Sequence, residues 1–408
     1  MQTRRLDLAL FGLIAALTVV GLLMVGSASS IIGSAQDGPF PLLISQLWKL
    51  IPGVALLILF WRLPYQKLSR LTRLAMPASL ILLVLVLVQG VGTSSHAAQR
   101  WISLGFFSFQ PAELVKLFLV LYLADNLTRR RDSLNEFKTG LLPPLLMILL
   151  SCGLLLLQPD LSSAVLVFVT AFTMFLIGGV SGKQLLLTLL ILIPLTLLAI
   201  YSEPYRWARI TAFVDPWAVS DAEGYQAVQS LLAIGSGGLT GVGLGASTQK
   251  LFYLPEAHTD FIFSILTEEL GLLGSLVVVA LFAGLIIIGL NIAKDTNDSF
   301  GRLLAVGITT WLGVQAIFNL GVVTALLPTT GLPLPFISYG GTSLVISLAA
   351  VGILGNIARQ SASGAIAPAV RSQGISPTTT ASFTRRVTSR PGGVRVYNPP
   401  ADNRRRWS

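Results

Sequence analysis

Residues 253–271 read YLPEAHTDFIFSILTEELG, and an apolar segment that begins within them, at Phe261, continues to Ala293. A helix rises 1.5 Å per residue, so this segment would be about 50 Å long as a single helix. The hydrocarbon core of a bilayer is only about 30 Å thick. We therefore expect the first turns of this helix to protrude, to tilt or to be sheltered by protein.

The composition of the whole chain indicates a membrane protein with many spans. The chain has 408 residues, of which 53% are hydrophobic and 11% charged, and its mean hydropathy is +0.76. Apolar segments long enough to cross a bilayer recur along it. The single cysteine, Cys152, excludes an intrachain disulfide, and the two histidines, His96 and His258, cannot form a multi-histidine zinc centre.

A hydropathy window of about 19 residues predicts about ten transmembrane helices. They are residues 6–26, 43–61, 75–91, 112–127, 141–157, 162–180, 184–201, 261–293, 303–327 and 337–357. The predicted fold class is therefore an all-α polytopic membrane protein.

The basic residues predict its orientation. If the spans alternate in direction, one side of the membrane receives Arg62, Lys67, Arg70, Arg73, Arg129, Arg130, Arg131, Lys138, Lys183, Lys294 and Arg302. Loops rich in Lys and Arg remain in the cytoplasm, so we expect both termini there. A large periplasmic or extracellular loop then joins the seventh and eighth helices. The net charge of +10 has this origin, and no basic stripe interleaved with aromatics indicates nucleic-acid binding.

We expect a ten-helix transmembrane domain over residues 1–360, with outer loops at about 92–111 and 202–260, and a tail at 361–408. The tail is rich in Ser, Thr, Pro and Arg, which predicts a disordered basic cytoplasmic segment. It is either a solvated segment near anionic headgroups or a motif for a partner. The first apolar segment is too long for a cleaved signal peptide, so we interpret it as a retained span.

The loop at 202–260 is too long and too aromatic to be a simple connector. It contains Gly235, Gly237, Gly238, Gly241, Gly243 and Gly245. These glycines could hold a phosphate with backbone amides, or they could only let the chain bend. Both interpretations stay open at this stage.

Five motifs closely resemble, in order, the signatures of the SEDS family (shape, elongation, division and sporulation). They are QRWISLGFFSFQPAELVK (99–116), QPDLS (158–162), GYQAVQSLLAIGSGGLTGVGLGAS (224–247), QKLFYLPEAHTDFIFSILTEELG (249–271) and GLPLPFISYGGTSL (331–344). The resemblance extends to about Arg359. The third and fourth motifs are more similar to division-type than to elongation-type members. The stretch TSSHAAQRW departs from the division-type pattern, which usually has an Asn-Gly pair there, so the shape of the first outer loop stays open.

The resemblance implies a peptidoglycan glycosyltransferase, that is, a lipid II polymerase. It would transfer lipid II disaccharide units from an undecaprenyl-pyrophosphate carrier to a sugar hydroxyl, at the outer face of the bacterial cytoplasmic (inner) membrane and at the division septum. The implied partners are a class B penicillin-binding protein, which is a transpeptidase, and divisome regulatory proteins.

Other functions remain as alternatives: an elongation-type polymerase, a lipid II flippase, and a scaffold that recruits a transpeptidase. The sequence shows no inverted repeat between its halves, and its motifs gather on one side of the membrane. Both observations favour chemistry at one face over transport by alternating access.

Asp260 is the candidate catalytic residue. It stands where a polar loop enters apolar sequence, so partial desolvation should raise its proton affinity and suit it to act as a general base toward the sugar hydroxyl. The resemblance also assigns catalysis to this position. The alternative is that Asp260 caps the helix that follows.

Other polar residues are candidates for binding or support. The candidate substrate-binding residues are Arg100, Trp101, Arg206, Arg209, Lys250, Glu256 and His258, although the basic residues could instead anchor to lipid headgroups. The candidate cavity or structural residues are Glu113, Lys116, Gln158, Asp160, Glu268, Glu269, Ser338, Gly340 and Gly341. Glu113 and Lys116 lie three apart on one helical face and can pair.

Three of these residues, Asp160, Glu268 and Glu269, each have two possible roles. Asp160 could line a cavity or cap the next helix, and Glu268 and Glu269 could hold helices together or bind a cation. No set of metal ligands can be assigned from the spacing. A divalent cation, Mg or Mn, could assist the pyrophosphate.

Overall fold

The computed structural model describes residues 6–32, 40–88, 92–95, 98–103, 105, 108–134, 136–251 and 253–362. The predicted disordered tail falls outside them, except for Ser361 and Ala362, which complete the last helix. The stretch around His96, which lacks the Asn-Gly pair of the division-type pattern, also lies partly outside the described residues.

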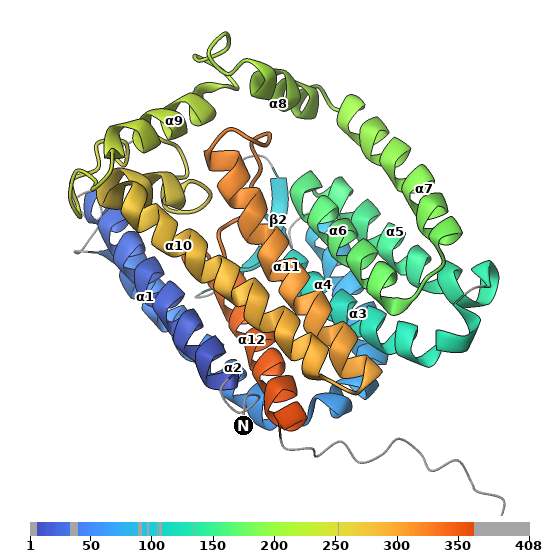
Figure 1. Ribbon diagram of the computed structural model, residues 1–408. Coiled ribbons are helices and arrows are strands. Elements are labelled where there is room, and N and C mark those ends of the chain that lie inside the picture. The colour runs from blue at the N-terminus through green and yellow to red at the C-terminus, as the bar shows by residue number, and fades with distance from the viewer. Residues whose placement is uncertain are drawn as a thin grey trace, which may run out of the picture. The chain divides into compact units, whose positions relative to one another are not determined.

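Ten long helices account for the predicted spans (Figure 1). They are α1 (Leu6–Ile32), α2 (Pro41–Arg62), α3 (Leu68–Leu87), α4 (Pro111–Arg129), α5 (Leu142–Leu157), α6 (Leu161–Gly178), α7 (Gly182–Tyr201), α10 (Ile262–Asp295), α11 (Ser299–Val323) and α12 (Gly341–Ala362). Short helical turns, η2 (Tyr65–Lys67), η3 (Arg131–Ser133) and η4 (Phe137–Leu141), connect some of them. The prediction of a polytopic helical membrane protein is confirmed.

Nine helices in the described part of the chain are long and apolar enough to span a membrane, and α4 is not among them. The reason is its charge, since α4 carries two acidic and two basic residues. These residues form two ion pairs, Lys116 with Glu113 at 2.7 Å and Arg129 with Asp125 at 2.8 Å. For the buried pair of Lys116 and Glu113, pairing within one helix offsets much of the cost of burying each charge, whereas Arg129 is exposed.

Several predicted boundaries differ from the observed ones, among them the ends of α1 and α3, both ends of α11, and the starts of α3 and α12. Helix α3 begins at Leu68 and not near Ala75, so Arg70 and Arg73 lie in the helix and not in the loop before it. Helix α12 begins at Gly341 and not at Ile337, because Pro333 and Pro335 keep the preceding segment out of a helix.

The excess length of α10 is resolved by a kink. Gly271 has φ 69° and ψ −170°, so it interrupts the helix after its first two turns. The residues before the kink, from Ile262 to Glu269, are all buried. The expectation that the first turns are sheltered by protein is therefore confirmed.

The glycine-rich stretch forms part of that shelter. The amides of Val242 and Gly243 donate to the carbonyls of Glu268 and Glu269 at 3.0 and 3.1 Å. A Cβ on Gly241 would lie 2.1 Å from the carbonyl oxygen of Glu269. These glycines allow the loop to approach the kink closely. The amides of Val242 and Gly243 are occupied by this contact and are not available to hold a phosphate.

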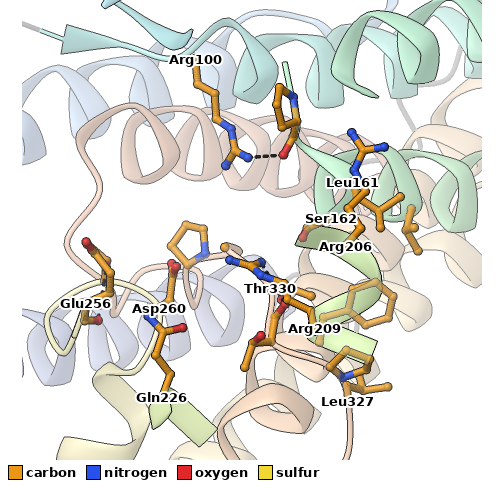
Figure 2. Close-up of a pocket in the computed structure, with 18 of the residues that line it drawn as sticks. Arg100, Leu161, Ser162, Arg206, Arg209, Gln226, Glu256, Asp260, Leu327 and Thr330 are labelled. Carbon is orange, nitrogen blue, oxygen red and sulfur yellow. Dashed lines mark hydrogen bonds between the residues drawn. The ribbon is translucent and has the colours of Figure 1, made fainter. Parts of the chain in front are cut away.

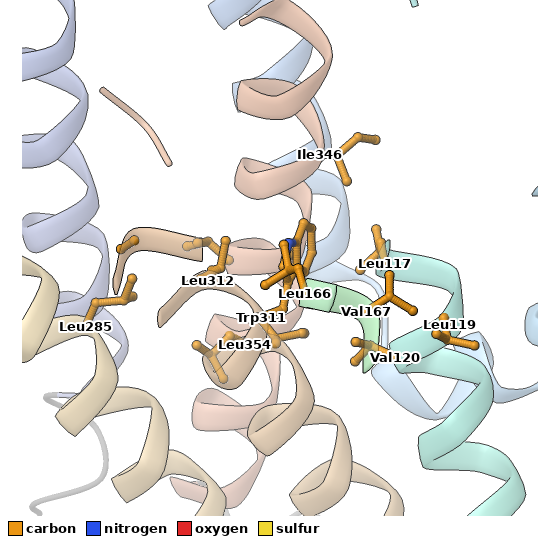
Figure 3. Close-up of a cluster of buried hydrophobic side chains, with 14 of the residues drawn as sticks. Leu117, Leu119, Val120, Leu166, Val167, Leu285, Trp311, Leu312, Ile346 and Leu354 are labelled. Atoms are coloured by element: carbon orange, nitrogen blue, oxygen red, sulfur yellow. The ribbon is translucent and has the colours of Figure 1, made fainter. Parts of the chain in front are cut away.

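Helices α11 and α12 form the centre of the bundle. The span of α12 is 100% buried and that of α11 is 72% buried. Figure 3 shows Trp311 and Leu312 of α11 between Leu285 of α10 and Val167 of α6. Small residues bring backbones together: a Cβ on Gly352 of α12 would lie 2.4 Å from the Leu57 carbonyl oxygen of α2.

The start of α1 and the end of α12 lie at the same end of the bundle (Figure 1). The ring of Phe11 lies 5.8 Å from that of Trp61, and the guanidinium of Arg359 lies 5.1 Å from the ring of Trp61. The alternation of the helices places the basic loops at this end too. The cytoplasmic assignment of this end stays a prediction.

The other end carries the two large loops. The first forms a small antiparallel sheet of β1 (Gly92–Ser95), β2 (Ala98–Ser103) and β3 (Ser108–Phe109), which the all-α prediction did not include. The second contains two helices, α8 (Pro204–Val214) and α9 (Tyr225–Gly237). In Figure 1 these two helices lie across the upper end of the bundle. We call this the cavity end.

Candidate functional site

A cavity of about 840 Å³ opens at the cavity end. Its walls come from segments far apart in the sequence: β2, the start of α6, the end of α7, α8, α9, the turn before α10, the segment between α11 and α12, and the start of α12. Figure 2 shows Arg100, Arg206, Arg209, Gln226, Glu256 and Asp260 around it. Its lining combines polar groups with an apolar side made by Ile200, Ile210, Phe318 and Leu327.

Asp260 lies in this cavity, two residues before α10. Its backbone is fixed by Asn319 of α11, whose amide donates to the carbonyl oxygen of Asp260 at 2.7 Å and to that of Leu332 at 2.9 Å. Among the described residues, nothing donates a hydrogen bond to its carboxylate. The N-cap of α10 is Phe261, with no side-chain capping bond. The capping interpretation of Asp260 therefore has no support in the structure.

The environment of Asp260 favours its protonated form. Burial of the carboxyl, together with the nearby Glu256 carboxylate, raises the pKa of Asp260 to about 7, against the opposing effect of Arg209 and Arg100. The side chain is only partly buried and keeps contact with the cavity. Water entering the cavity would lower this pKa, and a ligand that displaces water would raise it.

Two guanidiniums face this carboxylate from different walls. Arg100 of β2 donates through Nε to the carbonyl oxygen of Gln158 at 3.0 Å and through Nη2 to that of Pro159. Its Nη1 and the Oδ2 of Asp260 both lie close to Gly331, since a Cβ there would be 3.8 and 3.6 Å from them. Arg100 is thus anchored through two nitrogens, with the third directed toward the centre of the cavity.

Arg209 is held in a similar way. Its Nη1 donates to the carbonyl oxygen of Thr329 at 3.1 Å, and its guanidinium lies 4.4 Å from the centre of the Tyr205 ring. Burial lowers the pKa of Arg209 from its ordinary value. A guanidinium remains charged at neutral pH, so this site has two fixed positive charges beside one carboxylate.

Arg206 lines the cavity, but its donors serve the fold. They reach the carbonyl oxygens of Ala199 at 2.7 Å and Leu156 at 3.1 Å, which ties α8 to the ends of α7 and α5. The side chain is buried. Arg206 therefore supports the wall of the cavity. Trp101, the aromatic candidate from the sequence, also lines the cavity.

Glu256 and His258 form the turn that presents Asp260. Glu256 has φ 55°, its carbonyl oxygen accepts from the amides of Thr259 and Phe261, and its Oε2 accepts from the Thr259 hydroxyl at 2.6 Å. Burial lowers the pKa of His258, whose ring lies 5.8 Å from that of Tyr339. Glu256 lines the cavity, whereas His258 does not.

The segment before α12 is tied to the same turn. The hydroxyl of Ser338 donates to the carbonyl oxygen of Thr259 at 2.6 Å and accepts from the amide of Leu334 at 2.8 Å. Gly340 lines the cavity, and a Cβ on Gly341 would lie 2.5 Å from the Cδ of Lys49. Ser338 is therefore a structural link, and Gly341 allows a close approach of α2 to α12.

The predicted pair in α4 acts from below the cavity. Lys116 bonds Glu113 at 2.7 Å and the Oε1 of Gln315 at 3.2 Å, and the Nε2 of Gln315 donates to the carbonyl oxygen of Pro333 at 2.8 Å. Pro333 lines the cavity, but neither Glu113 nor Lys116 does. The pair supports the floor of the cavity through one intermediate side chain.

Gln158 and Asp160 are also structural in this arrangement. The amide nitrogen of Gln158 donates to the carbonyl oxygen of Leu83 at 2.8 Å. Asp160 is the N-cap of α6 and accepts from the amide of Ser163 at 3.1 Å. The capping interpretation of Asp160 is the one that the structure supports.

Lys250, Glu268 and Glu269 form a separate buried cluster. Lys250 pairs with Glu269 at 2.8 Å, and Glu269 also accepts from the hydroxyl of Ser27 in α1 at 2.6 Å. Glu268 accepts from the amide of Thr248 at 3.0 Å and from its hydroxyl at 2.9 Å. Lys250 does not line the cavity, so its placement gives it a structural role in place of the expected role in substrate binding.

Several cavity residues were not among the candidates from the sequence. They are Gln110, Ser162, Tyr205, Gln226, Thr329, Thr330, Tyr339 and Ser343. Gln226 follows Tyr225 at the start of α9 within the GYQ motif, so the motif could have indicated it. Gln110, Ser162, Tyr339 and Ser343 also lie within the quoted motifs, whereas Tyr205, Thr329 and Thr330 lie outside them, and for these three the sequence spacing gives no signal.

The helical bundle and this cavity define a polytopic membrane protein with a polar site at one end. Residues 7–363 match the FtsW/RodA/SpoVE family, described as "Cell cycle protein", and the chain belongs to this family. The family predicted from the motifs is thereby confirmed.

Named relatives and solved structures are similar over most of the chain. A protein of Geobacter metallireducens is 40% identical over 87% of this chain and 95% of its own, and one of Coxiella burnetii is 44% identical over 84% and 93%. Both are named "Probable peptidoglycan glycosyltransferase FtsW".

A chain in a structure titled "Structural coordination of polymerization and crosslinking by a peptidoglycan synthase complex" is 33% identical, with a TM-score of 0.72, over 86% of this chain and 97% of that one. The rod shape determining protein RodA of Thermus thermophilus is also 33% identical, with a TM-score of 0.63, over 86% and 96%.

Proposed function

We propose that this protein is a peptidoglycan glycosyltransferase of the division type, which polymerises glycan strands from lipid II. The observation that carries the proposal is the carboxylate of Asp260, which faces the cavity, receives no hydrogen bond from the described residues, and lies near the guanidiniums of Arg100 and Arg209. The names of the curated relatives, at 40% and 44% identity, support the same activity. The site would lie at the outer face of the bacterial cytoplasmic membrane.

In this proposal Asp260 is the general base. Its carboxylate takes the proton from the attacking sugar hydroxyl, whose oxygen forms a bond to the anomeric carbon of the lipid-linked donor. The bond from that carbon to the pyrophosphate oxygen breaks, and the pyrophosphate leaves with the electron pair. A base with a pKa of about 7 is close to the optimum at neutral pH, because about half of it is ionised and the ionised form still holds a proton well.

Arg100 and Arg209 stabilise the negative charge that develops on the leaving pyrophosphate. Their anchors to backbone carbonyls fix them before the substrate arrives, so little reorganisation is needed during the reaction. The apolar side of the cavity, formed by residues such as Ile210 and Leu327, suits the start of an isoprenoid chain.

A divalent cation, Mg or Mn, would be held at the carboxylate of Glu256, which lines the cavity, with Asp260 left unligated to act as the base. Magnesium sites in proteins often use one or two carboxylates and complete their shell with substrate phosphates and water. Within the described ranges no group of three or more His, Cys, Asp or Glu side chains could hold a metal by itself. When bound, the ion would neutralise charge on the pyrophosphate.

We further propose that the protein works at the division septum with a transpeptidase of the class B penicillin-binding proteins and with divisome regulators. The solved relative belongs to a synthase complex whose title couples polymerization with crosslinking, which supports the first of these partners. Localisation in dividing cells tests the division role, since a signal along the sidewall without a midcell band would contradict it.

The activity is tested with purified full-length protein and lipid II in detergent. Strand growth should be seen for the wild type and lost in Asp260→Asn, which keeps the size of the side chain and removes the base. Glu223→Gln, which alters an exposed carboxylate in the same loop, is the matched control and should retain activity. Strand growth by folded Asp260→Asn at the wild-type rate would refute the assignment. A flippase would give no strands in any variant.

A further inference from the structure

The N-terminus of α12 reaches the cavity with its amides free. The first hydrogen bond of this helix runs from the amide of Leu344 to the carbonyl oxygen of Gly340 at 3.0 Å. Among the described residues, the amides of Gly341, Thr342 and Ser343 have no acceptor. Such a group of amides carries partial positive charge and favours an anion.

A second observation points to a ligand at this place. Ser343 is only 8% exposed, it lines the cavity, and in the described part of the chain its hydroxyl has no hydrogen-bond partner. The side chain is largely buried and its hydroxyl opens to the cavity, so a ligand or water there can complete its hydrogen bonds. The neighbouring hydroxyl of Thr342 is already used, because it accepts from the amide of Gln110 at 3.2 Å.

A nearby lysine strengthens the case for a negative ligand. The stem of Lys49, in α2, passes beside Gly341, and its ammonium donates to the Tyr339 hydroxyl at 2.9 Å and lies 4.4 Å from the centre of that ring. Within the described residues Lys49 contacts no carboxylate. A lysine in a membrane helix beside a helix N-terminus brings two positive groups together, and an anion would relieve their repulsion.

We propose that the N-terminus of α12 is an oxyanion subsite of the cavity, which binds a phosphate group of the lipid-linked substrate through the amide and hydroxyl of Ser343. This inference rests on the proposed function for the identity of the ligand. A carboxylate of the substrate's peptide has the same hydrogen-bonding chemistry, so the test must separate the two sources.

The test measures binding and needs no turnover. Inorganic pyrophosphate is titrated calorimetrically into full-length Asp260→Asn protein in detergent, and the dipeptide D-alanyl-D-alanine is titrated in parallel as the carboxylate probe. Ser343→Asp is then added to the same chain. A carboxylate at the third position of a helix is compatible with its dipole, so this variant should fold, but it should repel an anion. Ser343→Asn is the neutral control, and thermal unfolding of each variant checks its folding.

The expected result is that pyrophosphate binds and that Ser343→Asp weakens its binding by about tenfold or more, while Ser343→Asn retains it within a few fold. Unchanged binding of pyrophosphate to folded Ser343→Asp, or no binding to the parent chain, would overturn the subsite. If only the dipeptide binds in a manner sensitive to Ser343→Asp, the phosphate assignment is overturned in favour of the peptide carboxylate. If the wild-type protein makes no strands while pyrophosphate still binds in a manner sensitive to Ser343→Asp, the result counts against the proposed function alone.

Discussion

The pair Glu268 and Glu269 and the single residue Asp260 lie close together in the sequence, yet their surroundings differ. Glu268 and Glu269 are buried, and their oxygens accept bonds from Lys250, Ser27 and Thr248. Asp260, eight residues earlier, faces a cavity, and among the described residues nothing donates to its carboxylate. The same kind of side chain is thus fully bonded in one place and left available in the other.

This difference separates structural from chemical roles. A buried carboxylate that is saturated with donors stabilises the fold and has no capacity left for a substrate. A carboxylate kept away from donors, with a raised pKa, costs stability and suits proton transfer. Four predictions test this contrast, beginning with the largest expected effect.

The first concerns Asp260. In Asp260→Asn the rate of strand growth should fall by about 10²–10⁴-fold, the usual contribution of a general base. Its melting temperature should be equal to that of the wild type or higher, because an ionised carboxylate in this cavity is unfavourable. A large loss of stability would show that Asp260 belongs with the structural carboxylates.

The second concerns Lys250. Its side chain and that of Glu269 are 4% and 0% exposed, so Lys250→Met leaves a buried charge without its partner. We expect a loss of about 3–5 kcal/mol in the free energy of unfolding. Thermal unfolding would measure it, and the double variant Lys250→Met/Glu269→Gln should recover part of the loss. A stable Lys250→Met protein with weakened substrate binding would return Lys250 to the site.

The third concerns Asn319, which positions Asp260 through its backbone carbonyl. Asn319→Ala should lower kcat by about 10–100-fold through misplacement of the base, with a smaller effect on KM. The midpoint of the pH profile should remain near that of the wild type, since the carboxyl itself is unchanged. A shifted midpoint with normal kcat would contradict a positioning role.

The fourth concerns pH. With a pKa of about 7, Asp260 should give a kcat/KM that rises about tenfold per pH unit below neutrality and levels off above it. Stability should show the opposite trend: the folded pKa exceeds the value of 3.8 for a free aspartate, so the contribution of Asp260 to stability falls as pH rises from about 4 to about 7. Unfolding of Asp260→Asn, measured over the same range, should lack this component. An activity profile that is flat between pH 5 and 7 would contradict the base.

The sequence alone predicted the long helices and singled out Asp260, which lies in the cavity, because hydropathy and a motif are local signals. It did not predict the contacts of Lys250, whose partner Ser27 lies in α1. It also did not predict those of Arg206, whose guanidinium donates to backbone carbonyls. It also did not single out Ser343, although this residue lies within a quoted motif, or Lys49. The proximity of Lys49 in α2 to the start of α12 joins segments almost three hundred residues apart, and no local pattern reveals such a contact.

The bond between Ser27 and Glu269, completed by Lys250, has a consequence for biosynthesis. Ser27 lies in α1, whereas its partners are synthesised more than two hundred residues later. Insertion of successive hairpins cannot close this contact. We therefore expect the kinked start of α10 and the glycine-rich loop to dock late, after both segments have been translated, and the turn that carries Asp260 to acquire its final shape at that stage.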